Sequence, residues 1–304
     1  MGLSRKTILI ILAFFAIYVI WGSTYLLNKI AVTEIAPLYL SGIRFIVAGS
    51  IIFIIAKFMK LNLSVSREQL INSCIAGMLF LGIGNGLFVW ALRYVDSGFA
   101  ALEASTQPIM ILVLMRLFDG KKIKTRSIIG VLCGILGIYL LVSQRGFTSN
   151  ENSIIGICMI FICVISWSCA SIFVSKATLP KNFFINAGYQ MITGGIILFI
   201  SSMVVGEQWL SPVVWSQPTL ISMVLLIIFG SIVAFTAFNY LLRNVSPEKV
   251  STNAYVNPII ALLLGWSILD EHISLQSIIA AIVLLTGVYF INSKRIVRPR
   301  ISGR

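Results

Sequence analysis

Residues 92–143 read LRYVDSGFAALEASTQPIMILVLMRLFDGKKIKTRSIIGVLCGILGIYLLVS, and the chain repeats this stretch 150 positions later, in residues 242–293. Fifteen of the 52 aligned positions are identical without a gap, and the identities include an Arg, a Pro, a Gly and a Tyr. Apolar composition raises the number of chance matches between aliphatic residues, but it does not explain matches of these four types at one fixed offset. The stretch therefore indicates an internal duplication.

The duplication extends upstream of this stretch. An offset of about 146 positions aligns three further pairs, Trp21 with Trp167, Gly42 with Gly188 and Gly49 with Gly195. We therefore predict two repeats of similar size, residues 7–143 and residues 153–293.

The composition excludes a soluble protein. Of the 304 residues 58% are hydrophobic and only 11% are charged, and the mean hydropathy is +0.99. A water-exposed surface requires about a quarter of the residues to be charged. Apolar runs of about 20 residues, the length of a helix that crosses a bilayer, separate the charged clusters. We predict an all-α polytopic protein of the lipid bilayer with ten transmembrane helices, at residues 7–28, 36–57, 69–92, 97–118, 126–143, 153–176, 183–205, 217–242, 247–269 and 273–293.

The basic residues favour one orientation in the membrane, because short cytoplasmic loops carry an excess of Lys and Arg. With both termini in the cytoplasm, ten helices place nineteen of the 23 basic residues inside, Arg44 within a helix, and three outside, Lys29, Arg93 and Arg145. The basic residues lie at the ends of apolar segments, so they form no folded basic face and nucleic acid is not expected as a partner.

Five helices in each repeat is an odd number, so the second repeat must be inverted relative to the first. The loops agree with this inference. Residues 119–124, DGKKIK, are basic and expected inside, whereas the equivalent loop at residues 270–272, DEH, is acidic and expected outside. Inverted repeats are an architecture of secondary transporters, which move one half against the other around a central site.

The chain also resembles a known family. The Trp21-Gly22-Ser23 end of the first helix, Arg44-Phe45 in the second, the helices with Pro108 and Pro258 and the 5+5 duplication resemble the EamA-type branch of the drug/metabolite transporter superfamily. The resemblance covers nearly the whole chain. It implies a multi-pass protein of the bacterial cytoplasmic (inner) membrane that transports a small organic molecule, and export rather than import rests on the resemblance alone.

Glu103 is the acidic residue predicted to lie inside a membrane segment, about 10 Å deep at 1.5 Å per residue. A carboxylate at that depth is either neutral or paired with a cation. Arg44 is predicted at a similar depth. Two interpretations remain open: a fixed pair that joins two helices, or a role for Glu103 in substrate binding and proton coupling.

Polar side chains also accompany the two equivalent prolines. Thr106 and Gln107 lie on the helical face of Glu103, and Pro108 removes a backbone donor next to them. The second repeat has Asn253, Tyr255, Asn257 and Pro258 at corresponding places. We expect both prolines to open their helices at a substrate site, and a packing kink is the alternative.

Further polar and aromatic residues are predicted to line the same path, and hydrogen bonds between neighbouring helices are the alternative for each amide. They are Trp21, Thr24, Tyr25, Asn85, Trp167, Gln190 and Asn239. The helices at 126–143 and 273–293 are instead aliphatic with Gly and Ser, and Gly130, Gly134 and Gly137 give the first of them a small-residue edge. We expect these two helices to be scaffold or a homodimer contact.

The sequence offers no motif of an enzyme. There is no GxxxxGK[ST] phosphate loop and no HExxH, the five cysteines lie in apolar runs, and no cofactor or metal is expected. We predict a secondary transporter that exports a small organic metabolite, such as an amino acid or a drug-like compound, by alternating access with proton coupling through Glu103. The alternatives are a facilitative carrier or channel-like permease without proton coupling, and a membrane-embedded enzyme.

Overall fold

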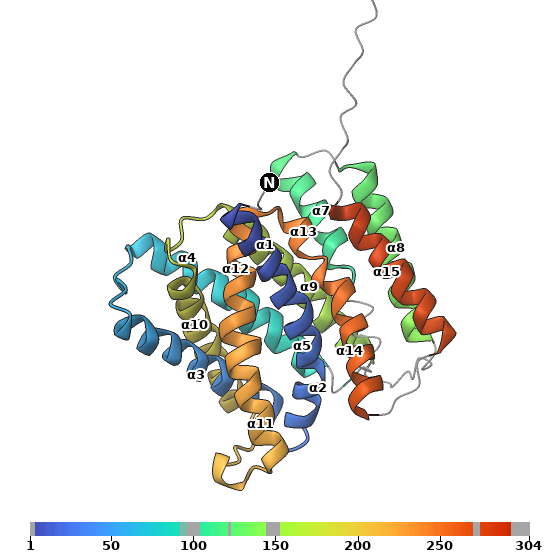
Figure 1. The fold of residues 1–304 in the computed structure, drawn as a ribbon. Coiled ribbons are helices and arrows are strands. Elements are labelled where there is room, and N and C mark those ends of the chain that lie inside the picture. The colour runs from blue at the N-terminus through green and yellow to red at the C-terminus, as the bar shows by residue number, and fades with distance from the viewer. Residues whose placement is uncertain are drawn as a thin grey trace, which may run out of the picture.

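The computed structural model describes residues 4–91, 94, 104–120, 123–143, 153–269 and 274–292, and over these residues the chain is helical without strands. Within the described part, seven runs of helix are long and apolar enough to cross a membrane, and the shorter run Thr125–Leu140 is also apolar. The chain is therefore a polytopic all-α membrane protein. In Figure 1, α3, α4 and α10 lie on one side of the bundle and α8 and α15 lie on the other. The helices α1, α2, α9 and α12 lie between them.

The first half begins its helices at recognisable signals. Ser4 and Ser66 cap α1 and α4 with their hydroxyls, and Pro37 and Pro108 occupy the first turns of α3 and α7, where a missing N–H is harmless. The elements of this half are α1 Arg5–Phe15, the π-helix η1 Ala16–Ile20, α2 Trp21–Ala31, α3 Pro37–Phe58, α4 Arg67–Gly77, the π-helix η2 Met78–Asn85, α5 Gly86–Ala91, α7 Gln107–Asp119 and α8 Thr125–Val142.

The second half follows the same signals. Asn182 and Ser216 cap α10 and α11, and Ser216 lies 150 positions after Ser66. The elements of this half are α9 Ser153–Lys176, α10 Phe183–Val204, the 3₁₀-helix η4 Pro212–Val214, α11 Gln217–Leu225, the π-helix η5 Leu226–Val233, α12 Ala234–Asn244, α13 Pro247–Val250, α14 Asn253–Leu269 and α15 Leu275–Asn292.

The main departures from the predicted helices are local changes of winding. The predicted helices 36–57 and 183–205 correspond to α3 and α10 within a few residues, but π-helical turns interrupt 7–28, 69–92 and 217–242. The predicted helix 247–269 is split at Ser251 and Thr252, whose hydroxyls bond back to the carbonyls of Glu248 and Lys249 and so compete with helical bonding. Apolar length, on which the helix prediction rests, carries no information about such turns.

The helices α3 and α10 pack through glycines that the two halves share. A Cβ atom at Gly49 would lie 3.0 Å from the carbonyl oxygen of Gly188, and one at Gly195 would lie 3.1 Å from that of Gly42. These two contacts exchange under the offset of 146 positions, because Gly42 aligns with Gly188 and Gly49 with Gly195. The two helices therefore approach each other in a nearly symmetric way, with no room for larger side chains.

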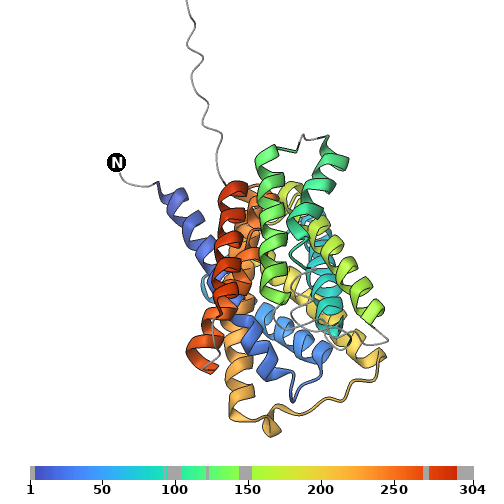
Figure 2. The same cartoon turned by 90° about the vertical axis from the view of Figure 1, so that its right-hand side faces the viewer.

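The other close pair is α8 and α15, which lie side by side in both views (Figures 1 and 2). A Cβ atom at Gly130 would lie 2.7 Å from the Gly287 carbonyl oxygen, and one at Gly137 would lie 2.7 Å from the Leu284 side chain. The small-residue edge of α8 is therefore used for packing within the chain.

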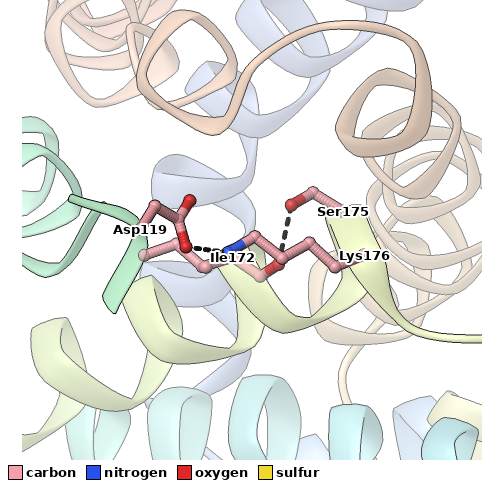
Figure 3. A network of polar contacts seen from close by, with 4 residues as sticks. All are labelled: Asp119, Ile172, Ser175 and Lys176. Carbon is pink, nitrogen blue, oxygen red and sulfur yellow. Dashed lines mark hydrogen bonds and ion pairs between the residues drawn. The ribbon is translucent and has the colours of Figure 1, made fainter. Parts of the chain in front are cut away.

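Polar contacts join the helix ends at the two ends of the bundle. At one end, Asp119 of α7 pairs with Lys176 of α9 (Figure 3), and Arg243 at the end of α12 donates to the Pro180 carbonyl at 2.9 Å. At the other end, the Ser216 N–H donates to Glu34 at 2.9 Å, and Glu207 accepts from the first turn of α3. The Asp119–Lys176 pair joins the first and second halves at one end, and the contacts of Glu34 and Glu207 join them at the other.

Candidate functional site

The two equivalent tryptophans meet in the centre of the bundle. The rings of Trp21, at the start of α2, and Trp167, in α9, are 6.1 Å apart between centroids and are nearly perpendicular, at 76°. This edge-to-face arrangement is the favourable one for aromatic rings. The alignment of the two positions in the sequence therefore corresponds to a physical contact between the two halves.

Each tryptophan lies against a π-helical segment of the opposite half. The Trp21 Nε1–H donates to the carbonyl oxygen of Gly230 in η5 at 3.0 Å. Trp167 packs on η2, where a Cβ atom at Gly84 would lie 3.0 Å from its ring, and the neighbouring Ser166 hydroxyl donates to the Leu79 carbonyl at 2.8 Å. A π-turn frees carbonyls from the helical ladder and is common at functional sites. Here side chains of the opposite half take up those carbonyls.

Three phenylalanines extend the aromatic cluster that the two tryptophans form. Phe80 of η2 lies 5.0 Å from Trp167, and Phe238 of α12 lies 5.0 Å from Trp21 and 6.0 Å from Trp167, between ring centroids. Phe235 closes the group at 5.9 Å from Phe80. All three phenylalanines are buried. The centre of the molecule is therefore a packed aromatic cluster to which both halves contribute.

Arg44 lies beside this aromatic cluster. It is only 6% exposed, its Nε donates to the Ser231 hydroxyl of η5 at 2.8 Å, and its guanidinium lies 4.9 Å from the centroid of Phe45. A Cβ atom at Gly230 would lie 2.9 Å from Arg44 Nη2, so the guanidinium approaches the backbone of η5 where glycine leaves room. The structure thus brings Arg44 to the residue that also binds Trp21.

Gln190 and Asn239 lie in a separate buried group. Asn239 Oδ1 accepts from Gln190 Nε2 at 3.0 Å and from Asn186 Nδ2 at 3.1 Å, and Ser73 is 3.1 Å from Asn186 Oδ1. The three amides are 0% exposed. This network joins α4, α10 and α12, which agrees with interhelical bonding for these two predicted site residues.

Asn257 interacts with the third π-helical segment. With its amide oriented to suit the surrounding carbonyls, Asn257 Nδ2 lies 3.2 Å from the carbonyl oxygens of Ile17 and Tyr18 in η1 and 3.1 Å from that of Asn253. The Tyr18 hydroxyl is 2.6 Å from that of Thr252, where α13 and α14 are separated. Asn257 therefore compensates for the irregular turn of the first helix.

The remaining predicted residues are placed as follows. Tyr255 packs its ring against Gly134 of α8, in a core group with Leu112 and Leu284, away from the tryptophans. Pro108 lies in the first turn of α7, and Pro258 lies inside α14. Buried polar atoms that have no hydrogen-bond partner among the described residues include Asn85 Oδ1, Gln107 Nε2, Gln190 Oε1, Asn253 Oδ1 and the Tyr255 hydroxyl.

Two predicted residues fall outside this description. Glu103 lies outside the described residues, so its relation to Arg44 stays a prediction, and only the backbone of Tyr25 is described, in α2. Thr24 is buried and bonds to the Trp21 carbonyl at 2.7 Å.

Several residues of the site were not predicted from the sequence. They are Ser231, Gly230, Ser166 and the three central phenylalanines, all of common types for a membrane helix. The sequence offered one signal, the presence of glycine in both of the helices that the 150-residue offset relates. These glycines are Gly82 and Gly84 in the first half and Gly230 in the second. Among the described residues, no group of three or more His, Cys, Asp or Glu side chains could hold a metal ion.

Comparison with known proteins agrees with this architecture. The model of the EamA-like transporter family matches twice, over residues 8–143 and 154–293. The chain is 37% identical over 305 residues to the uncharacterized inner membrane transporter YedA of Escherichia coli, with 95% of each chain covered. It is 24% identical to a "probable amino-acid metabolite efflux pump" of Escherichia coli, over 90% of this chain and 91% of that protein.

One solved crystal structure of a protein has the same fold, with a TM-score of 0.78 and 17% identity, over 95% of this chain and 97% of that chain. At this identity the likeness concerns the fold alone. Because the family model covers nearly the whole chain in two copies, this protein is a multi-pass transporter of the bacterial inner membrane that belongs to the EamA-like transporter family.

Proposed function

We propose that the chain is a secondary transporter that exports a small organic metabolite by alternating access between two inverted five-helix repeats, residues 7–143 and 153–293. The observation that carries this proposal is the contact of Trp21 with Trp167, each packed on a π-helical segment of the opposite half. A site made of equivalent residues from both repeats can face either side of the membrane when one half moves against the other.

The proposed topology has ten helices with both termini in the cytoplasm. Contacts at the two ends of the bundle support it. Asp119 and Lys176, which the topology places inside, lie at helix ends and pair between the halves, and Arg243 lies at the same end, where it bonds to Pro180 within the second half. Glu34 and Glu207, which it places outside, make such contacts with Ser216 and Tyr39. The contacts at the first end include Lys176 and Arg243, whereas those at the second end include no basic residue, as the positive-inside rule leads us to expect.

The residue types at the centre of the molecule support a substrate class. Aromatic rings, a backbone carbonyl and a buried guanidinium suit an amphipathic metabolite such as an amino acid, with apolar groups against the rings. The relative named as a probable amino-acid metabolite efflux pump supports the same class. We keep Glu103 as the proposed proton-coupling residue, because a membrane-embedded carboxylate that changes protonation is a common coupling device.

A counterflow assay tests the proposal. Liposomes that contain the purified protein are loaded with unlabelled amino acids and placed in labelled amino acids. The label should accumulate inside transiently, because a carrier that takes an unlabelled molecule out returns with a labelled one. Trp167→Ala should reduce the rate at least tenfold, while Phe58→Ala, at the exposed end of α3, should leave it unchanged. A linear flux without trans-stimulation would instead indicate a channel-like permease. No flux with any amino acid, drug-like cation or other metabolite in the panel would refute the proposal.

A further inference from the structure

The charge of Arg44 has no counterpart in the aromatic cluster, whose side chains are neutral. The side chain is more than nine-tenths buried, and its only described polar partner is the neutral hydroxyl of Ser231, which accepts from Nε at 2.8 Å. The Phe45 ring adds a cation–π contact. Burying a charge is costly unless a group of opposite charge compensates for it. These contacts offset part of the charge of the guanidinium and include no anion.

The described carboxylates do not provide an anion either. Glu34 accepts from Ser216, Glu207 accepts from the first turn of α3, and Asp119 pairs with Lys176. Glu68 lies in the first turn of α4 and Glu248 in that of α13. Within the described part of the chain, no carboxylate lies within 4.0 Å of the Arg44 guanidinium nitrogens.

The geometry around Arg44 suits a bound carboxylate. Nε is used by Ser231, which leaves the Nη groups as donors, and a guanidinium binds a carboxylate through two parallel hydrogen bonds. The Ser231 oxygen accepts from Arg44, which leaves its hydroxyl hydrogen as a further donor beside the guanidinium. Gly230 carries no side chain between the guanidinium and the backbone of η5, and its carbonyl fixes Trp21 beside them.

We propose that Arg44, with Ser231, binds the carboxylate group of the transported metabolite, while its apolar part lies against Trp21 and Trp167. The substrate is accordingly a small amphipathic carboxylic acid, with or without an amino group. This inference rests on the proposed function, since it assigns the substrate class of the same site. It also separates the two interpretations of Arg44, because a fixed internal ion pair gives no dependence of binding on a carboxylate in the ligand.

The test is a binding comparison of ligands that differ in one group. The full-length protein in lipid nanodiscs is titrated with apolar L-amino acids, their amides and their N-acetyl derivatives, and tryptophan fluorescence is recorded. The wild type should bind amino acids and N-acetyl amino acids at least tenfold more tightly than the amides. Arg44→Gln should abolish this difference, Arg44→Lys should keep part of it, and Gly230→Ala should reduce it by displacing the guanidinium.

Arg243→Gln is the matched control, because it removes an arginine from the end of α12, where the side chain bonds to Pro180, and should leave the preference unchanged. The wild-type comparison needs no variant, so it remains decisive if Arg44→Gln does not fold. The proposal would be overturned if the wild type bound acids and amides equally, preferred the amides, or showed no binding that depends on a carboxylate. It would also be overturned if Arg44→Gln kept the preference for acids. Carboxylate-dependent binding without counterflow would refute the transport function and leave the site standing. Counterflow of amides equal to that of acids would refute the carboxylate site and leave the transport function standing.

Discussion

The carboxylate of Glu207 accepts a hydrogen bond from the backbone N–H of Tyr39 at 2.9 Å and another from that of Leu38 at 3.2 Å. Leu38 and Tyr39 are in the first turn of α3, whose N-cap Ala36 has no side-chain acceptor. A residue of the second half therefore caps a helix of the first. Trp209 reinforces the contact by stacking on Tyr39, with 5.5 Å between ring centroids and 9° between planes.

Removing this cap should destabilise the protein. We expect Glu207→Ala to lower the free energy of unfolding by about 1 kcal/mol, the usual effect of losing an N-terminal cap. Glu68→Ala, also in the first turn of a helix, is the control for general charge effects. Unfolding in detergent micelles measures both variants. Equal stability of wild type and Glu207→Ala would show that water replaces the carboxylate without loss.

Glu34 should give the protein a dependence on acid pH. Hydrogen bonds from the side chain and backbone N–H of Ser216 lower the pKa of Glu34 below its ordinary value of 4.5. The stabilisation is therefore complete above pH 4.5 and is lost as the pH falls through the lower pKa of the folded state. Glu34→Gln should lose this part of the acid dependence of thermal unfolding. An identical acid limb in both proteins would contradict the contact.

The ion pair of Asp119 and Lys176 should act on conformation more than on stability. It joins the ends of α7 and α9, which belong to different halves (Figure 3). A pair of this kind at the surface contributes less than about 1 kcal/mol to folding. If this end opens during transport, Asp119→Asn should favour the open state. The rate at which a thiol reagent labels Cys169 from the cytoplasmic side should then rise. The double charge reversal should restore the wild-type rate, and unchanged labelling in Asp119→Asn would show that the pair does not hold this end closed.

Glu103→Gln tests coupling. The amide has the shape of the acid but cannot ionise, so the variant should still bind and exchange substrate in counterflow while losing accumulation driven by an imposed pH difference. Proton-driven uptake into inverted vesicles measures this loss. Glu248→Gln, outside the predicted membrane interior, is the control. Full pH-driven transport by Glu103→Gln would make the protein a facilitator or assign its coupling to another group.

The sequence predicts the parts of this fold that depend on apolar length and duplication. Gly42 and Gly188 align at a fixed offset because both repeats need the same close approach of α3 and α10, and the structure contains both contacts. Trp21 and Trp167 align at the same offset and their rings are in contact, whereas their place on a substrate path stays a prediction.

The partners of the polar residues could not be predicted. Ser231 is an ordinary residue for a membrane helix, and its bond to Arg44 depends on a π-turn in η5 that shifts the facing side chains. Glu207 stands in a loop, and its position over α3 follows from the contact between the halves. Such relationships arise from tertiary geometry, which neither residue type nor spacing encodes.

Alternating access between the repeats can be measured as two distances in the same protein. Spin labels at Thr33 and Val213 report on the end held by Glu34 and Ser216, and labels at Phe118 and Lys181 report on the end held by Asp119 and Lys176. Substrate and a pH gradient should change the two distances in opposite directions, so that one end closes as the other opens. Distances that stay fixed, or that increase together, would contradict transport by movement of one half against the other.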